Sequence, residues 1–303
     1  MDSPPRLRVG VVSAGRVGAV LGAALRSAGH VLTGVAAVSD ISLLRAEALL
    51  PGVPVLPADQ VAGDCELLIL AVPDDVLPGL VDGFARAGIF QAGQFVAHTS
   101  GGYGIGVLEP ATLCQPMAIH PAMTFTGTSV DLSRLHDAPF GVTAPENVRP
   151  VAEALVVEMG GEPVWVPEEA RAVYHAAMVL GSNYMNVLVN ESLSLLREAG
   201  MENPTRLLTP LLSASLDNAL RYGDKALTGP VARGDSATID KHLDALAHRP
   251  STRNAYQVLG RLGVDRALDA GILSVDQAAQ LLITLGRDNN GEPFNGDTFG
   301  GAR

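Results

Sequence analysis

The sequence has little cysteine, lysine and aromatic content, and these shortages exclude several classes of protein. Cys65 and Cys114 are the only cysteines among 303 residues, too few for a disulfide framework or a cysteine-based zinc site. Lysine occurs only at Lys225 and Lys241, so a mechanism that needs a lysine has two candidates. The formal net charge of −11 argues against nucleic acid and anionic membrane surfaces as main partners.

Targeting and membrane-spanning patterns are also missing. Residues 1–8 lack the basic and then apolar arrangement of a signal peptide, and no stretch is apolar and uncharged for long enough to span a bilayer. The hydrophobic content of 47% is sufficient for the cores of two ordinary domains. We therefore expect a soluble, cytoplasmic protein with two domains.

Short apolar runs alternate with helical patterns in the first half of the chain, as in parallel sheets built from βαβ units. Strands are expected at residues 7–12, 31–38, 67–72, 95–99, 118–119, 140–143 and 163–166, and helices at residues 15–27, 43–50 and 148–158. From Glu168 to Leu285 amphipathic helical patterns replace the strands. The prediction is an α/β, doubly wound and mainly parallel domain over residues 1–167, an all-helical domain over residues 168–286, and a disordered tail over residues 287–303.

A glycine-rich turn follows the first expected strand and opens the first expected helix. The dinucleotide-binding pattern Gly-x-Gly-x-x-Gly falls on Ser13, Gly15 and Gly18, with serine in the first place, and Arg16 and Val17 complete the turn. The second glycine allows close approach of a pyrophosphate, the third allows close helix packing, and the helix N-terminus supplies partial positive charge. A glycine turn without a ligand is the weaker interpretation. The first domain is therefore predicted to be a Rossmann domain that binds NAD or NADP.

The end of the second strand decides between the two cofactors. An acidic residue there binds the ribose 2′-hydroxyl, whereas hydroxyls and arginine suit a 2′-phosphate. The chain offers Ser39, Asp40 and Arg45, with Arg16 in the glycine turn. Asp40 is either a ribose ligand or the first residue of the next helix, where carboxylates are favoured. We expect NADP, with Ser39, Arg16 and Arg45 near its 2′-phosphate.

Two further strand ends are expected to border the cofactor. Val72, Pro73 and Asp74 follow the strand at residues 67–72, and Thr99 and Ser100 follow the strand at residues 95–99. In a sheet wound this way, the carboxyl ends of these strands lie beside the riboses. The alternative interpretation is a strand stop with a helix cap at Asp74 or Asp75, and both interpretations can hold together.

Three polar clusters are candidates for a substrate site. They are the His-Thr-Ser-Gly segment at residues 98–101, the His-Pro segment at residues 120–125, and a stripe on the first helix of the second domain that includes Tyr174, His175, Ser182, Asn183, Asn186 and Asn190. At 3.6 residues per turn, Ser182 and Asn186 fall near the azimuth of His175, with Asn183 at roughly 80° from it. Apolar neighbours predict that this face is buried, where polar side chains need partners or line a ligand cleft.

Reduction of a carbonyl by hydride needs a group that polarises or protonates the oxygen, and His175 and Asn183 suit that task. Each of these polar residues taken alone is more often structural, but the stripe as a whole favours a cleft. His242 and His248 are expected at the surface, because no other ligands with metal-binding spacing accompany them.

Together these motifs resemble those of the Rossmann-like proteins that carry the helical domain of unknown function 2520. The resemblance covers most of residues 7–285 and includes the Leu-Thr-Gly-Pro and Arg-Gly-Asp segments at residues 227–235. More distantly, the arrangement is similar to pyrroline-5-carboxylate reductases, β-hydroxyacid dehydrogenases and ketopantoate reductases. The resemblance implies a Rossmann domain followed by helices, and a homodimer formed through the helical domain.

The resemblance also implies a leading hypothesis, which is an NADPH-dependent reductase of a small 2-oxo acid, with ketopantoate of pantothenate biosynthesis as the named substrate. The better-known ketopantoate reductases use a lysine and an asparagine on this helix, for which His175 and Asn183 are the nearest substitutes. In this hypothesis one of them polarises the oxygen, and Ser100, His120 and Asp240 orient the substrate. The alternatives are reduction of a cyclic imine, as in pyrroline-5-carboxylate reductases, and a non-catalytic protein that senses NADP.

Overall fold

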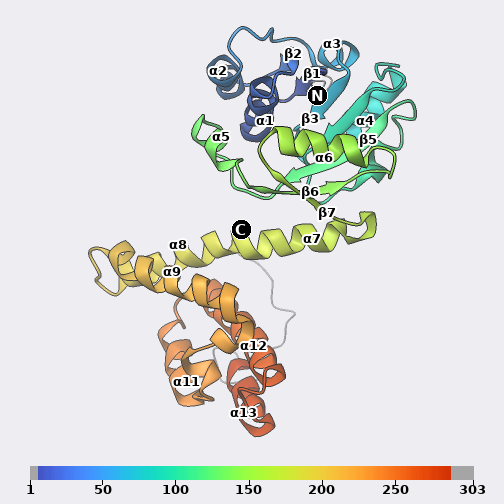
Figure 1. Ribbon diagram of the computed structural model, residues 1–303. Coiled ribbons are helices and arrows are strands. Elements are labelled where there is room, and N and C mark those ends of the chain that lie inside the picture. The colour runs from blue at the N-terminus through green and yellow to red at the C-terminus, as the bar shows by residue number, and fades with distance from the viewer. Residues whose placement is uncertain (1–5, 288–303) are drawn as a thin grey trace. The chain divides into compact units, whose positions relative to one another are not determined.

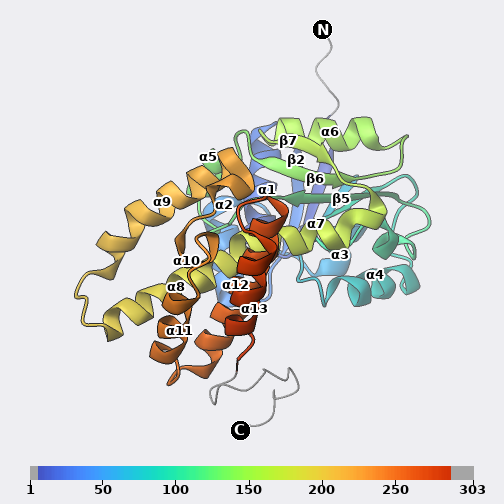
Figure 2. The same cartoon turned by 90° about the horizontal axis from the view of Figure 1, so that it is seen from below.

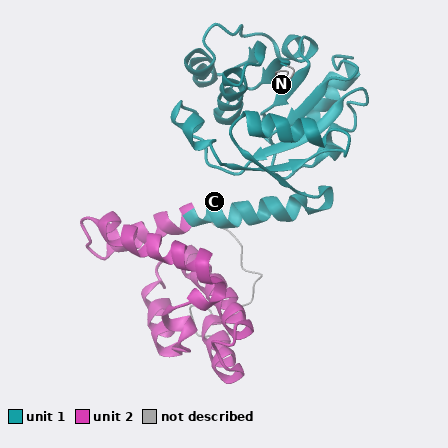
Figure 3. Cartoon of the chain, in the orientation of Figure 1, with its two compact units in different colours: residues 1–185 teal, residues 186–303 magenta. Residues whose placement is uncertain are grey.

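The computed structural model describes residues 6–287 and divides into two compact units, residues 1–185 and 186–303 (Figure 3). We call them the sheet unit and the helical unit. The division lies beyond the boundary expected at Pro167, because helix α7 (Arg171–Met178) bonds to the sheet through Arg171 and Tyr174. Apart from Arg287, the predicted disordered tail lies outside the described residues.

Within residues 6–287 the sheet unit contains seven strands in the order β2-β1-β3-β4-β5-β6-β7 (Figure 1, Figure 2). They are β1 (Arg8–Val12), β2 (Val31–Ala36), β3 (Leu67–Leu70), β4 (Phe95–His98), β5 (Gln115–Pro121), β6 (Pro139–Thr143) and β7 (Glu162–Trp165). All pairings are parallel except that of β5 with β6. The predicted α/β fold with a mainly parallel sheet is confirmed.

Helices cover both faces of this sheet (Figure 1). The core on one face includes α1 (Arg16–Ser27), α2 (Asp40–Leu49) and α6 (Arg149–Glu158). The core on the other face includes α3 (Ala58–Gly63) and α4 (Leu77–Arg86), which the sequence did not predict. The strands are apolar on both sides, and all four residues of β3 are buried, as expected for a sheet covered on both faces.

The strand order places a ligand-binding edge at the centre of the sheet. Because β2 and β3 lie on opposite sides of β1, the chain winds away from β1 in both directions, and open α/β sheets bind ligands at such a switch point. The carboxyl ends of β1, β3, β4 and β5 point to the same edge, since these strands are parallel. This edge carries Ser13, Asp74, Ser100 and His120.

The helical stretch after β7 is not a continuous α-helix. The 3-10 turn η2 (Glu168–Ala170) precedes α7, and the π turn η3 (Val179–Asn183) separates α7 from α8 (Tyr184–Glu198). A π turn contains about one residue more than an α turn, so the residues after it rotate by roughly 100°. The alignment predicted for Ser182 assumed a continuous α-helix, and the π turn instead brings Asn183 toward the azimuth of His175. The expected burial is not found either, since Met178, Leu180 and Tyr184 are exposed.

The helical unit contains only helices within the described residues, as predicted. After α8 come α9 (Pro204–Tyr222), η4 (Gly223–Ala226), α10 (Gly229–Ala232), α11 (Ser236–Ala245), α12 (Pro250–Asp269) and α13 (Val275–Leu285). Its core is formed mainly by α11, α12 and α13. By contrast, α8 buries no residue and α9 buries only Pro204. Between residues 6 and 287, no helix combines the length and apolar character needed to cross a membrane.

Candidate functional site

The glycine turn after β1 has the geometry that a dinucleotide pyrophosphate requires. Ser13 adopts a φ of 83°, which explains why this place usually holds glycine. A Cβ on Gly18 would lie 2.1 Å from the Ser13 carbonyl oxygen and 2.9 Å from the Ala71 Cβ, so that glycine is needed for packing. A Cβ on Gly15 would meet nothing nearer than the Ser13 hydroxyl at 3.3 Å. The space beside Gly15 therefore stays open at the N-terminus of α1, where no side chain caps the free N–H groups.

Two arginines flank a second glycine beside this turn. A Cβ on Gly127 would lie 2.5 Å from Arg45 Nε and 3.1 Å from Arg16 Cγ. Gly127 is held in a left-handed conformation by the buried carboxylate of Asp131, which accepts hydrogen bonds from the N–H groups of Gly127 and Thr126 at 2.7 and 2.8 Å. The segment that begins at the carboxyl end of β5 thus ends between two positive side chains, a setting suited to a phosphate.

Ser39 and Asp40 begin α2, and the structure gives Ser39 a capping role. Its hydroxyl accepts a hydrogen bond from Ser42 N at 3.2 Å, and the Ser42 hydroxyl accepts one from Ser39 N at 2.9 Å. Asp40 is the first helical residue and is exposed, as the helix-start interpretation predicted. Positive charge at this strand end therefore comes from Arg16 and Arg45.

Asp74 faces the loop that follows β4 and does not cap α4. The N-cap of α4 is Val76, without a side-chain capping bond, and the Pro73 carbonyl accepts the Val76 N–H at 3.0 Å. A Cβ on Gly102 would lie 3.7 Å from an Asp74 carboxylate oxygen. Val72 is half-buried beside it. The turn after β3 therefore borders the same space as the loop after β4.

The loop after β4 is fixed from both ends. The imidazole of His98 is fully buried, and its Nε2–H donates to the Gly104 carbonyl at 2.9 Å. Burial lowers the pKa of His98 to about 4, so the ring is neutral and acts as a structural brace. Glu168, which precedes α7, accepts hydrogen bonds from Ile105 N at 2.8 Å and Gly106 N at 2.9 Å. Sequence reasoning missed Glu168, because its partners are distant in the chain.

The hydroxyl of Ser100 and the backbone of Thr99 stabilise the start of this loop. Ser100 is buried, and its hydroxyl accepts a hydrogen bond from Tyr103 N at 3.2 Å. Thr99 N donates to the Leu70 carbonyl at 3.1 Å, which extends the pairing of β4 with β3. Ser100 therefore has a structural partner within this loop.

Two imidazoles meet over the Gly101–Gly102 pair. The ring centroids of His120 and His175 lie 5.9 Å apart. A Cβ on Gly101 would lie 2.8 Å from His175 Cδ2 and 3.0 Å from His120 Nε2, and one on Gly102 would lie 3.0 Å from His175 Nδ1. Burial, and then the neighbouring His175, lower the pKa of His120 to about 4, so this ring is neutral at pH 7. The glycine pair thus lies directly beneath two groups that can donate N–H hydrogen bonds.

Arg171 and Tyr174 attach α7 to the sheet. Sequence reasoning placed Tyr174 in the polar stripe of the candidate substrate site and did not select Arg171. Arg171 is buried, and its guanidinium donates to the Thr143 hydroxyl at 2.7 Å and to the Ala118 and Gly141 carbonyls at 3.0 Å. The sequence did contain a signal, since residues 171, 174 and 175 have the i, i+3, i+4 spacing that places side chains on one helical face.

Two predicted residues are not joined to this cluster by any described contact. Asn183 is exposed on the π turn. Asp240 lies on α11 of the helical unit, where its carboxylate is 3.8 Å from the Arg287 guanidinium. Their predicted roles at the substrate stay predictions.

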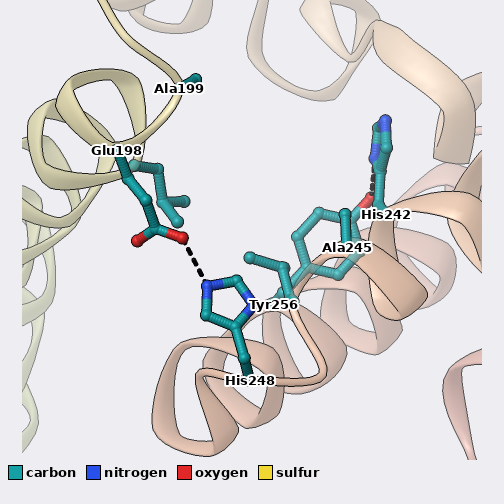
Figure 4. A pocket seen from close by; sticks show the side chains of 8 residues that line it. Glu198, Ala199, His242, Ala245, His248 and Tyr256 are labelled. Carbon is teal, nitrogen blue, oxygen red and sulfur yellow. Dashed lines mark hydrogen bonds and ion pairs between the residues drawn. The ribbon is translucent and has the colours of Figure 1, made fainter.

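The helical unit has a pocket of about 410 Å³ of its own (Figure 4). His242 Nδ1 lies 2.8 Å from the Tyr256 hydroxyl, and His248 contacts the Glu198 carboxylate. Both histidines are exposed, as predicted, and each is paired within the pocket wall. Across residues 6–287, no group of three or more acidic, histidine or cysteine side chains is arranged to hold a metal ion.

Solved structures similar to this chain share its fold at low sequence identity. A Bacteroides fragilis protein with the provisional name NADP oxidoreductase is 20% identical, with a TM-score of 0.72, over 85% of this chain and 98% of that one. An imine reductase from Pseudomonas sp. is 19% identical, with a TM-score of 0.62, over 91% and 98%. Pyrroline carboxylate reductase of Plasmodium falciparum, solved with NADP bound, is 13% identical, with a TM-score of 0.53, over 90% and 98%. The chain has no match among curated proteins.

Two family models match the sequence. The Rossmann-like domain matches residues 2–121, and the domain of unknown function DUF2520 matches residues 138–262. The second match begins at β6, so it includes the last two strands of the sheet unit together with α7 and most of the helical unit. The chain is therefore a Rossmann-like protein that carries a C-terminal domain of unknown function 2520, as the sequence motifs predicted.

Proposed function

We propose that this protein is an NADPH-dependent reductase of a small carbonyl compound. The observation that carries the proposal is the open glycine turn after β1 on the same sheet edge as two facing imidazoles, His120 and His175. Open α/β sheets bind ligands at this edge, and carbonyl reduction needs N–H or O–H donors there. The names of the similar solved structures, an NADP oxidoreductase and two reductases, support NADP-dependent reduction of a small compound.

The cofactor proposal assigns three groups of residues. The turn formed by Ser13, Gly15, Arg16, Val17 and Gly18 holds the pyrophosphate, because Gly15 leaves room and the α1 N-terminus is uncapped. Arg16 and Arg45 bind the 2′-phosphate, with Ser39 beside them. Val72, Pro73, Asp74, Thr99 and Ser100 border the riboses. When bound, the reduced nicotinamide supplies a hydride.

The substrate proposal begins with a 2-oxo acid, and ketopantoate is the first compound to test. His120 and His175 offer N–H donors to the substrate oxygen, while His98 and Glu168 hold the loop of Ser100 rigid beneath it. The second candidate is a cyclic imine, which the names of two similar structures favour. Because a protonated imine already carries the proton that its product keeps, this substrate makes a smaller demand on the histidines.

The test follows absorbance of reduced nicotinamide after ketopantoate or pyrroline-5-carboxylate is added to the purified protein with NADPH or NADH. We expect oxidation that is faster with NADPH than with NADH. The Gly15→Ala variant should fold normally yet bind cofactor at least ~10-fold more weakly in calorimetry, since the added methyl group occupies the phosphate cradle. Tight NADPH binding without turnover of either compound would instead favour a protein that senses the NADP state.

We also infer that two copies of the chain associate through the helical unit. α9 exposes Leu207, Leu211 and Leu220 at 57%, 61% and 80%, and α8 exposes Val187 at 63%. These exposed side chains form an apolar surface on two long helices, and a surface of this extent is usually covered by a partner. A second copy of the chain can cover it, because it presents the same surface. Light scattering should report a dimer, and Leu211→Lys should shift it toward monomer, whereas the equally exposed Val157→Lys on α6 of the sheet unit should not.

A further inference from the structure

The hydroxyl of Tyr174 lies between a histidine of the proposed active site and a glycine of the sheet. It is 2.8 Å from His120 Nδ1, with the two rings nearly perpendicular at 87° and their centroids 5.6 Å apart. On its other side, a Cβ on Gly141 would lie only 2.5 Å from this hydroxyl. The phenol is therefore confined, and His120 Nδ1 is its hydrogen-bond partner among the described residues.

This contact fixes the position of the proton on His120. If the phenol donates to Nδ1, both polar atoms are satisfied; if it accepted, its own proton would lack a described partner. The neutral ring then carries its proton on Nε2. That atom faces Gly101, where a Cβ would lie 3.0 Å from it, so the absent side chain keeps the donor accessible to a ligand.

Arg171 supplies a positive charge directly beside this pair. Its guanidinium carbon lies 5.8 Å from the centre of the Tyr174 ring, and its hydrogen bonds go to a hydroxyl and two carbonyls instead of a carboxylate. Its Nη1 atom is buried without a hydrogen-bond partner in the described residues. The charge of Glu168 acts on this guanidinium, but no ion pair joins the two among the described residues. A buried cation whose hydrogen bonds go to neutral groups is costly, unless a negative charge develops next to it.

We infer that Tyr174, His120 and the substrate oxygen form a proton relay, with Arg171 as the positioning residue that stabilises the phenolate formed at its end. This inference rests on the proposed reductase function and names its acid. As the carbonyl carbon accepts hydride, the C–O π bond breaks and the oxygen takes the Nε2 proton of His120. Nδ1 takes the phenolic proton of Tyr174 at the same time, so His120 stays neutral. After the alcohol leaves, solvent gives one proton to Nε2 while Nδ1 returns its proton to the phenolate, which restores the resting tautomer.

The charges around the relay suit this direction of transfer. Burial raises the pKa of Tyr174 while Arg171 acts to lower it, so the phenol keeps its proton at rest and the cation becomes important only during the reaction. Around His120, in addition to Tyr174, the charged and titratable groups are Arg171, His175, Asp74 and His98. Because the donor is a phenol with a raised pKa, the relay predicts a kcat that is flat from about pH 6 to about pH 9. An imidazolium donor of ordinary pKa would lose rate tenfold per pH unit above about 6.5.

The decisive variant is Tyr174→Phe, which keeps the ring and removes one oxygen. Tyr256→Phe is its matched control, because Tyr256 makes the same hydrogen bond to His242 in the helical unit. We expect Tyr174→Phe to lower kcat for ketopantoate by about 100-fold at unchanged NADPH affinity, with no change in Tyr256→Phe. Arg171→Lys, which keeps the charge but loses the planar geometry, should lower kcat less.

Ring ¹⁵N chemical shifts, assigned with His120→Asn, test the relay without turnover. In the wild type His120 should be protonated at Nε2 alone, and Tyr174→Phe should produce a mixture of both tautomers. A proton on Nδ1 in the wild type would overturn the inference, as would an unchanged kcat in Tyr174→Phe or a kcat that falls tenfold per unit from about pH 6.5. If neither ketopantoate nor pyrroline-5-carboxylate is reduced, the proposed function fails. The relay is still tested separately, because it requires the His120 proton to lie on Nε2 and not on Nδ1.

Discussion

Two histidine–tyrosine pairs of nearly the same geometry lie in different surroundings, one in each unit. In both, the histidine Nδ1 is 2.8 Å from the tyrosine hydroxyl, and the ring centroids are 5.6 Å apart for His120–Tyr174 and 5.7 Å for His242–Tyr256. His120 is half-buried beside Arg171 above a glycine loop, whereas His242 is exposed on α11. Because both pairs have the same geometry, the proposed reactivity of His120–Tyr174 must come from its surroundings. Those are its lower exposure to water and the space that Gly101 leaves beside His120.

The largest effect should come from removing each histidine in turn. His120→Ala should lower kcat by about 1,000-fold, because it removes the donor that contacts the substrate oxygen, while His242→Ala should leave kcat within about 2-fold. Steady-state kinetics with NADPH and ketopantoate measure both variants. Calorimetric NADPH binding is the control for folding. Equal losses in the two variants would show that the surroundings do not distinguish the pairs.

The second effect concerns acid stability and separates buried from exposed histidines. Since burial lowers the pKa of His98 to about 4, the folded protein excludes a proton that the unfolded chain binds below about 6.5. This contribution to stability is complete above about pH 6.5 and is lost as the pH falls toward about 4, by about 3 kcal/mol in total. Urea unfolding across this range should show a flatter profile for His98→Gln than for the wild type.

His242→Gln provides the matched control for that profile. Because the His242 side chain is exposed on α11, its replacement should not remove the acid sensitivity that the burial of His98 produces. A profile that flattens equally in both variants would contradict the assignment of the acid sensitivity to burial.

The smallest effect compares the arginines of the two units. Arg171→Met should lower the free energy of unfolding by about 2 kcal/mol, because two strand carbonyls and the Thr143 hydroxyl lose their donor. Arg249→Met removes ion pairs to Glu191 and Glu198 at the surface of the helical unit and should cost under about 1 kcal/mol. Urea unfolding at neutral pH distinguishes the two values, and a reversed order would contradict the role of Arg171 as an anchor.

Much of the fold was predictable because strong local patterns carry it. Each predicted strand is present, since a sheet covered on both faces needs uninterrupted apolar runs. Helix α4 was missed because Pro78, Gly79 and Gly83 weaken its helical pattern, and α3 is only six residues long. The antiparallel pairing of β6 with β5 could not be predicted either, because a buried strand has the same composition whether it runs parallel or antiparallel to its neighbour.

The residues of the candidate site could be predicted at the ends of the strands, but less well on helix α7. Ser100 follows β4 and His120 lies at the carboxyl end of β5, and doubly wound sheets bind ligands at these strand ends as a rule. Arg171 and Tyr174 act through strands far away in the chain, and no local pattern distinguishes a buried arginine from an exposed one. The π turn at Val179–Asn183 was missed because one additional residue in a helical turn does not change the amino-acid composition in a recognisable way.

That π turn has a consequence for how such a protein can change over evolutionary time. Gly181 lies within it, and apart from its chain neighbours and the backbone of its own helix, no described atom lies within 4 Å of the place where its Cβ would be. Loss of this single codon would restore α-helical register and rotate Asn183 by roughly 100°, while every residue before Val179 keeps its place. A lineage could thereby change, in one genetic step, which side chain follows His175 on its helical face, and retain the residues that hold α7 on the sheet.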